Sequence, residues 1–332
     1  MIKNQIKIIA EIGVNHNGSL KIAKKLIDEA KKCNADYVKF QTFRAKNLVT
    51  KNLSVLKYQK NKKHQKQLSL LNSLEISEKN FFILKKYAEK RKIEFLCTPF
   101  DIESAIFLKK LGLKIFKLPS GEINNYPLLE LISKISKKVI LSTGMSTLKE
   151  IKYALNVLTQ NKLTKKDITV LHCTTQYPAE LKNINLSAIK TIKKNLNISV
   201  GYSDHTETDL TSILAAGMGA EIIEKHITLS KKMFGPDHKA SMEIEDFKKF
   251  VENLKKVKII LGKHIKAPTK DEKKYKNFIR KSIVAKKNIK KGEKFNTHNI
   301  TTKRPEGGIS PVNWRKIIGK KSKKNYLIDD FI

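Results

Sequence analysis

The chain alternates short β-like runs with longer amphipathic segments, and this alternation restricts its possible folds more than any other feature. Eight runs have the pattern of a strand: residues 6–12, 36–43, 93–100, 114–120, 138–144, 168–174, 198–204 and 220–226. A helical pattern follows each run directly except the second, where residues 44–76 intervene. Because consecutive parallel strands need helical crossovers, the pattern predicts an α/β fold, a (β/α)₈ TIM barrel over residues 1–262.

The last fifth of the chain has a different pattern. Residues 263–279 are polar, include a proline and lack an apolar stripe, so we expect a linker there. Residues 280–332 have short β-branched runs and glycine turns, which predict a small β-rich domain. A piece of this size has little core of its own, so we expect it to pack against another surface.

The composition excludes some classes of protein. The formal net charge is +37, but the lysines are spread along the chain, with no basic stripe interleaved with aromatic residues. We interpret the charge as solvated surface and expect no specific nucleic-acid partner, with polyanion binding as the alternative. No apolar run approaches the roughly 18 residues that span a membrane, so we expect no membrane segment.

The N-terminus and the cysteines favour the cytoplasm. The chain enters a strand pattern almost at once, without the apolar region of a secretory signal. Its three cysteines, Cys33, Cys97 and Cys173, are widely spaced and form no C-x-x-C pair. This usage is typical of a reduced compartment and argues against a zinc site.

In a barrel of this kind the chemistry lies at the carboxyl ends of the strands. Each predicted strand ends in polar or ionisable residues: Glu11, Lys39, Gln41, Thr98, Lys117, Ser120, Ser142, His172, Thr174, Ser203, His205 and His226. Alternation along a strand puts Glu224 on the same face as His226, one layer below it. We therefore expect Glu224 to support His226 or to need a partner for its buried charge.

Two kinds of site are compatible with these strand ends. His205 and His226, on adjacent strands, can give two imidazole ligands to one divalent metal, or they can be unconnected. The lysines, hydroxyls and nearby glycines suit a phosphate: Lys39, Lys117, Thr98, Ser120, Ser142, Ser203, Gly121 and Gly144. Glu11 and Glu122 are then the candidates for proton transfer.

At this point the motifs resemble those of the bacterial sialic acid synthase family, which includes N-acetylneuraminate, legionaminate and pseudaminate synthases. The matching stretches are "IIAEIGVNHNG", "VKFQTF", "TPFD", "KLPSGE", "LSTGMST", "GYSDHT", "EKHITL", "GPDHKAS" and "KRPEGGIS". The resemblance covers nearly the whole chain, and residues 280–332 are similar to the antifreeze-like (SAF) domain. The stretch "AEIGVNHNG" is typical of the sialate and legionaminate branches rather than the pseudaminate branch.

The resemblance implies a transferase that condenses phosphoenolpyruvate with an N-acylated mannosamine-type sugar. The product is a nine-carbon 2-keto acid, and phosphate leaves by C–O cleavage. We expect N-acetylneuraminate synthase, acting on N-acetylmannosamine. The alternative is N,N'-diacetyllegionaminate synthase, acting on the diacetylated 6-deoxy analogue.

The resemblance also assigns roles to residues. His205 and His226 would hold a divalent metal, Mn²⁺ first and Mg²⁺ or Co²⁺ as alternatives. Glu11 would be the base for the water that attacks carbon 2, and Glu122 would act on the acceptor sugar. The residues implied to bind phosphoenolpyruvate are Lys39, Thr98, Lys117, Ser120, Ser142 and Ser203, and those implied to bind the sugar are Gln41, Tyr177, Asp237 and Arg304. In this family the C-terminal domain carries its arginine over the barrel of a second protomer, which implies a swapped homodimer.

The sequence departs from the family pattern at two places. Many relatives have asparagine just after the cysteine, where this chain has Thr174 and Thr175, and Glu306 replaces a usual glycine. A carboxylate at position 306 can pair with Arg304.

Two rival functions are also compatible with the sequence. One is a Schiff-base aldolase, with Lys39 or Lys117 as nucleophile, and the other is a carbohydrate- or polyanion-binding module without catalysis.

Overall fold

The structure is a computed structural model that describes residues 6–55 and 65–332. The chain divides into two compact units, Met1–Gly262 and Lys263–Ile332, which are described separately below. Residues 56–64, within the segment expected between the second strand and its helix, lie outside the described part. No helix of the described residues is long and apolar enough to cross a membrane.

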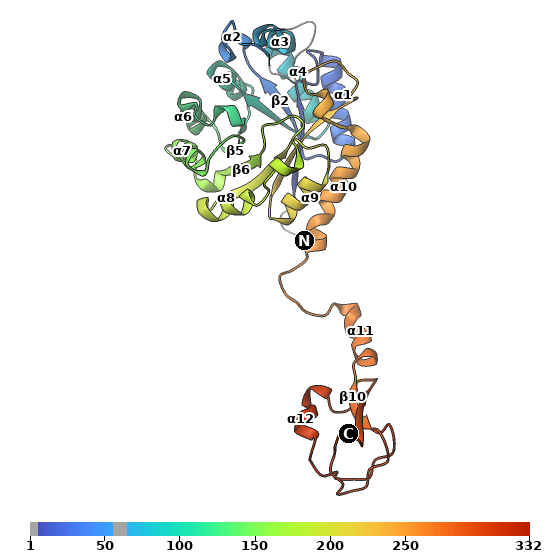
Figure 1. Cartoon of the computed structure of the whole chain (residues 1–332). Helices are drawn as coiled ribbons and strands as arrows, with labels where there is room; N and C mark the ends of the chain where they lie inside the picture. Colours follow the sequence, from blue (N-terminus) through green and yellow to red (C-terminus); the bar gives the residue numbers. More distant parts are fainter. Residues whose placement is uncertain (1–5, 56–64) are drawn as a thin grey trace. The chain divides into compact units, whose positions relative to one another are not determined.

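The first unit is a nearly closed barrel of eight parallel strands, as predicted (Figure 1). The strands are β1 (Lys7–Gly13), β2 (Tyr37–Thr42), β3 (Glu94–Pro99), β4 (Ile115–Leu118), β5 (Lys138–Ser142), β6 (Ile168–Cys173), β7 (Ser199–Asp204) and β8 (Ile222–Thr228). Their hydrogen-bonded order is β3-β2-β1-β8-β7-β6-β5-β4, so β3 and β4 are its two ends. A two-residue strand, β9 (Met242–Glu243), pairs with β8 beyond the barrel.

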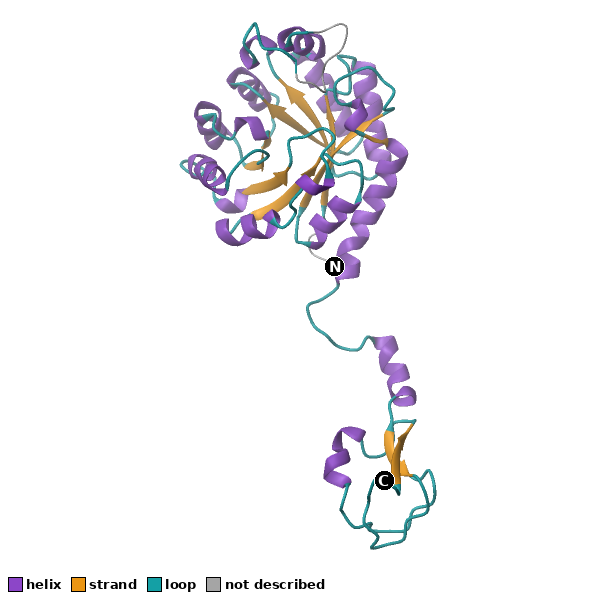
Figure 2. Cartoon of the chain, in the orientation of Figure 1, coloured by secondary structure: helices purple, strands orange, loops and turns teal. Residues whose placement is uncertain are grey.

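Helices form a ring outside the strands (Figure 2). They are α1 (Leu20–Lys32), α4 (Glu78–Lys90), α5 (Ile102–Lys110), α6 (Tyr126–Ile135), α7 (Leu148–Leu158), α8 (Ala188–Leu196), α9 (Leu210–Gly217) and α10 (Ile244–Leu261), with the short α2 (Ala45–Leu48) and α3 (Gln67–Leu74) after β2. Local sequence sets several of their starts. Ser19 caps α1 by accepting the Ile22 N–H, and Thr147 forms a capping box with Glu150 at α7.

Alternation along each strand separates the core from the site. Outward residues such as Phe40, Phe116 and Ile223 are buried against the helices, each contributing about 1.5–3 kcal/mol of hydrophobic stabilisation. Inward residues toward the amino ends of the strands, among them Ile9 and Leu171, form a small apolar cluster. The next inward positions toward the carboxyl ends are polar, so the barrel interior changes from a packed core to a site within one layer.

The second unit contains one element that we did not expect. Residues 270–279, within the predicted linker, form helix α11 (Lys270–Ile279). The reason is local, because Thr269 and Glu272 form a capping box at its start. Beyond it lie the antiparallel pair β10 (Ser282–Ala285) and β11 (Ile300–Lys303) and the short α12 (Trp314–Ile317). Their small core consists of Ile283, Ala285, Ile289, Phe295, Ile300, Ile317 and Ile332.

Candidate active site

Three polar side chains from β1 and β2 meet inside the barrel. The Lys39 Nζ lies 2.8 Å from Glu11 Oε2, and both side chains are buried. Gln41 Nε2 donates to the other oxygen, Glu11 Oε1, at 3.0 Å. This arrangement follows from the parallel register, which places Glu11 opposite Lys39. Glu11 is thereby held between a cation and an amide.

Glu224 lies between two buried lysines. Its Oε2 is 3.5 Å from Lys39 Nζ, and its Oε1 is 3.8 Å from Lys117 Nζ. Ser203, its partner in the β7–β8 register, donates to Oε1 at 2.8 Å. Glu224 is thus the shared counter-ion of two lysines that come from β2 and β4.

Burial and charge act against each other in this cluster. Burial alone would raise the pKa of Glu224, but the charges of Lys117 and Lys39 lower that pKa to about 2. Burial lowers the pKa of Lys117, opposed by Glu224. The pKa of Lys39 is raised, because Glu11 and Glu224 together outweigh its burial. Burial raises the pKa of Glu11, opposed by Lys39, which brings this carboxyl closer to a base that works near neutral pH.

The hydroxyls expected to bind an anion surround these lysines. Lys39 Nζ donates to Thr98 Oγ1 at 3.2 Å, and Lys117 Nζ donates to Ser142 Oγ at 2.6 Å. Ser120 Oγ accepts the Gly144 N–H at 2.9 Å. A Cβ at Gly144 would overlap Thr175 Oγ1, so only glycine brings its N–H this close to Ser120. The structure therefore brings all six predicted phosphoenolpyruvate residues into one neighbourhood.

The two candidate metal ligands are close together and neutral. The His205 and His226 ring centroids are 5.7 Å apart. Burial and the neighbouring His226 lower the pKa of His205 to about 4, and burial and Lys39 lower that of His226 to about 3. Both rings therefore offer lone pairs at neutral pH.

The hydrogen bonds of the two rings fit a metal. His205 Nδ1 lies 2.7 Å from the Thr174 carbonyl oxygen, so Nδ1 carries the proton and Nε2 is left as the electron-pair donor. Among the described residues, no hydrogen-bond partner reaches the buried His226 Nδ1. No group of three or more His, Cys, Asp or Glu side chains is gathered around a metal position within residues 6–55 and 65–332. These residues would supply two protein ligands and leave the other positions to water and substrate.

Tyr177, Asp237 and Glu122 are the other predicted site residues of the barrel. The Tyr177 ring is 4.1 Å from the His205 ring, centroid to centroid. Asp237 is partly buried after β8, and burial, with the charge of Glu11, raises its pKa to about 7. Glu122 is half-buried, two residues after Ser120, and accepts from Asn125 Nδ2 at 2.6 Å. Its partial burial raises its pKa.

Three further residues of the sequence analysis, His172, Arg304 and Glu306, have surroundings of their own. His172 faces the helices, with its Nε2 2.8 Å from the Ile184 carbonyl oxygen and its ring stacked on Tyr202. Arg304 belongs to the second unit, directly after β11, and is exposed. In the part of the chain that the structure describes, Glu306 makes no ion pair with Arg304, so the pairing considered above is wrong for this structure; Glu306 Oε2 is buried without a hydrogen-bond partner.

From the sequence we missed a further buried ion pair, which lies on the outer side of the barrel wall. Lys225 Nζ lies 3.0 Å from Asp204 Oδ2 and donates to the Thr206 carbonyl oxygen at 2.6 Å. Thr211 and Ser212 of α9 also donate to Asp204. The pair fixes the loop that follows His205. Alternation could have found it, because "EKH" turns Lys225 toward the helices, where an unpaired lysine is not tolerated.

Two family models match the chain, and so do curated proteins over nearly its full length. Residues 26–266 match the model of the NeuB family, and residues 280–332 match that of the SAF domain. The N,N'-diacetyllegionaminic acid synthase of Campylobacter jejuni is 49% identical over 98% of this chain and 98% of its own. The protein of the same name from Legionella pneumophila is 40% identical over 96% of this chain and 90% of its own.

A solved structure is also similar. The N-acetylneuraminic acid synthetase of Leptospira borgpetersenii, in complex with citrate, is 34% identical, with a TM-score of 0.74 over 82% of this chain and 90% of that chain. The family match covers most of the barrel, and the curated relatives align over nearly the full length. The chain is a member of the NeuB family with a C-terminal SAF domain.

Proposed function

We propose that the chain is a nonulosonic acid synthase that condenses phosphoenolpyruvate with a diacetylated 6-deoxymannosamine-type sugar to give N,N'-diacetyllegionaminate. The observation that carries the proposal is the barrel cluster of two buried lysines, Glu11, Glu224 and two neutral histidines in a chain of this family. For the sugar, the 49% identity to a legionaminate synthase favours the alternative over our first expectation, N-acetylmannosamine.

The lysines and hydroxyls are suited to phosphoenolpyruvate. Lys39 and Lys117 are fixed by Glu224 before any substrate binds, so little reorganisation is needed when the trianion arrives. Their charge-assisted hydrogen bonds are the strong kind that phosphate and carboxylate oxygens accept. The Schiff-base alternative is less consistent with the geometry, since both lysines are committed to carboxylates and hydroxyls.

His205 and His226 are the residues that would hold a divalent metal, which would supply Lewis-acid polarisation of the sugar's aldehyde oxygen. Carbon 3 of phosphoenolpyruvate forms a bond to the aldehyde carbon, and the aldehyde oxygen gains a proton, for which Glu122 is the donor. Glu11 takes a proton from the water that adds at carbon 2. The C–O bond to phosphate then breaks, leaving a ketone, so phosphoenolpyruvate, sugar and water give keto acid and phosphate.

Comparing the two sugars tests the proposed specificity. We expect kcat/KM for the diacetylated 6-deoxy sugar to exceed that for N-acetylmannosamine by more than about tenfold, or about 1.4 kcal/mol in transition-state binding. Steady-state phosphate release with each sugar gives the ratio. A ratio that favours N-acetylmannosamine by the same margin would return the assignment to the sialate branch.

The histidine pair is tested by metal binding as well as activity. We expect His205→Ala and His226→Ala each to lower Mn²⁺ affinity by at least about tenfold, because one of only two protein ligands is lost. Calorimetric titration of chelator-treated protein measures the affinity, and circular dichroism checks the fold. Unchanged Mn²⁺ affinity in both variants would show that the metal is held elsewhere.

The swapped homodimer and the role of Arg304 stay predictions from the resemblance, and the cytoplasmic location stays a prediction from the sequence. They do not enter the chemistry proposed here.

A further inference from the structure

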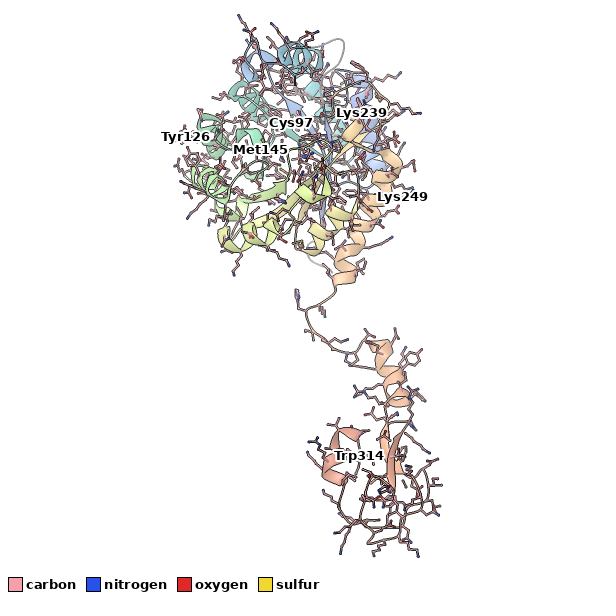
Figure 3. The ribbon with its side chains drawn as sticks, in the orientation of Figure 1. Cys97, Tyr126, Met145, Lys239, Lys249 and Trp314 are labelled. Atoms are coloured by element: carbon pink, nitrogen blue, oxygen red, sulfur yellow. The ribbon has the colours of Figure 1, made fainter. Side chains whose placement is uncertain are left out.

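The segment between β8 and β9, residues 229–241, carries Asp237 and is bound to the loop after β1. We call residues 229–241 the Asp237 segment. Asn17 Nδ2 donates to the Phe234 carbonyl oxygen at 2.7 Å, and Asn15 Nδ2 donates to Ser241 Oγ at 2.8 Å. These contacts join positions more than 200 residues apart in sequence. Figure 3 labels Lys239 in this segment.

His238 is the buried centre of the junction. Its side chain is fully buried, with Nδ1 2.7 Å from Thr228 Oγ1 and Nε2 3.2 Å from Asn17 Oδ1. Burial lowers the pKa of His238 to about 4, so the ring is neutral at pH 7 and carries one proton. Asn17 Nδ2 is already bonded to Phe234, so Asn17 Oδ1 faces the ring, and that proton must be on Nε2. His238 therefore donates to Asn17 through Nε2. The Thr228 hydroxyl, which also lies 3.0 Å from the Ser230 carbonyl oxygen, then gives its one proton to His238 Nδ1 at the shorter distance of 2.7 Å.

Gly235 leaves room for this contact. A Cβ at position 235 would lie 2.6 Å from His238 Cδ2 and 2.7 Å from Asn17 Oδ1. The glycine also has φ +154°, at the limit of the backbone region that favours glycine. A single methyl group at Gly235 would thus enter the gap where the two side chains meet.

We propose that His238 is a positioning residue. Its hydrogen bond to Asn17, which we call the latch, holds the Asp237 segment so that Asp237 faces Glu11 and the acceptor sugar. The inference rests on the proposed function for its substrate, but the latch itself is a property of the fold. Within the described part of the chain, the His238 side chain hydrogen-bonds to Thr228 and Asn17 and not to the lysine cluster. Its loss should therefore affect the sugar and spare phosphoenolpyruvate.

Two isosteric variants separate the two ring nitrogens. In H238Q the amide nitrogen can occupy the place of Nε2 and still donate to Asn17. In H238N the side chain reaches only the place of Nδ1, so the Thr228 contact is kept and the latch is lost. We expect H238N to raise KM for the sugar about tenfold, in line with the loss of one buried hydrogen bond, and to leave KM for phosphoenolpyruvate within about twofold. H238Q should stay within about threefold of the native enzyme for both substrates.

Amide hydrogen exchange gives a readout independent of activity. We expect peptides from the Asp237 segment to exchange faster in H238N and in Gly235→Ala than in the native chain and in H238Q. Should H238N fail to fold, Gly235→Ala carries the same comparison. Equal behaviour of H238N and H238Q, or a joint rise of both KM values, would overturn the latch. A native chain that turns over neither sugar would overturn the proposed function instead, and the exchange comparison would still test the latch.

Discussion

Replacing Glu11 with glutamine is expected to lower kcat by about 10²- to 10⁴-fold, the range that one general base contributes. The amide keeps the size of the side chain and can still accept from Gln41, but it cannot take a proton from water. The substitution also removes the carboxylate charge that lies 2.8 Å from Lys39. Lys39 still keeps Glu224 as its other counter-ion. The barrel should therefore fold, and the loss should be in turnover.

Rapid-quench measurement of product formation with both substrates saturating gives this rate. Glu221→Gln is the matched control, because Glu221 is a carboxylate just before β8 whose partners are Ser199 and Lys193 rather than the cluster. We expect native rates from it. If Glu11→Gln keeps more than about a tenth of native kcat, far above the range for a lost general base, Glu11 is not the base.

The second large effect concerns two buried lysines that face opposite sides of the barrel wall. Lys117→Met should raise KM for phosphoenolpyruvate by about 30-fold or more, because a charge-assisted contact of about 2–5 kcal/mol is lost. Lys225→Met removes the partner of Asp204 and leaves a buried carboxylate without its counter-ion. That change should cost about 3–5 kcal/mol of unfolding free energy while leaving KM for phosphoenolpyruvate within about threefold of native.

Each variant is the control for the other. Urea unfolding gives the stability of both, and steady-state kinetics at saturating sugar gives KM. We expect the two variants to lose different properties: Lys117→Met loses binding of phosphoenolpyruvate, and Lys225→Met loses stability. A Lys117→Met enzyme that binds phosphoenolpyruvate normally would remove this lysine from the anion site.

Much of the site follows from alternation in single strands. A period of two puts Lys39 with Gln41 and Glu224 with His226 on one face, and the structure has both pairs pointing into the barrel. The rule that barrel chemistry lies at the carboxyl ends of strands then gathers residues far apart in sequence. We did not apply this alternation to His172. Because the neighbouring Cys173 points inward, alternation turns His172 toward the helices, as the structure has it.

The rest depends on how separate strands and loops come together. Glu224 lies between Lys39 and Lys117 because of the stagger of strands in the barrel, and no single strand contains that information. The contact of His238 with Asn17 joins loops 221 positions apart, and polar motifs alone do not show which side chains meet. Helix α11 was missed for a different reason, since its capping box was overlooked beside a polar composition.

The proposed C–O cleavage can be tested by following the oxygen that bridges carbon 2 and phosphorus in phosphoenolpyruvate. With that oxygen labelled as ¹⁸O, and with the diacetylated sugar and Mn²⁺ present, mass spectrometry locates the label after turnover. We expect the label to leave in inorganic phosphate and the keto oxygen of the product to come from water, because the C–O bond breaks. Label retained in the product, or a pyruvyl adduct trapped on a lysine by borohydride, would contradict this expectation.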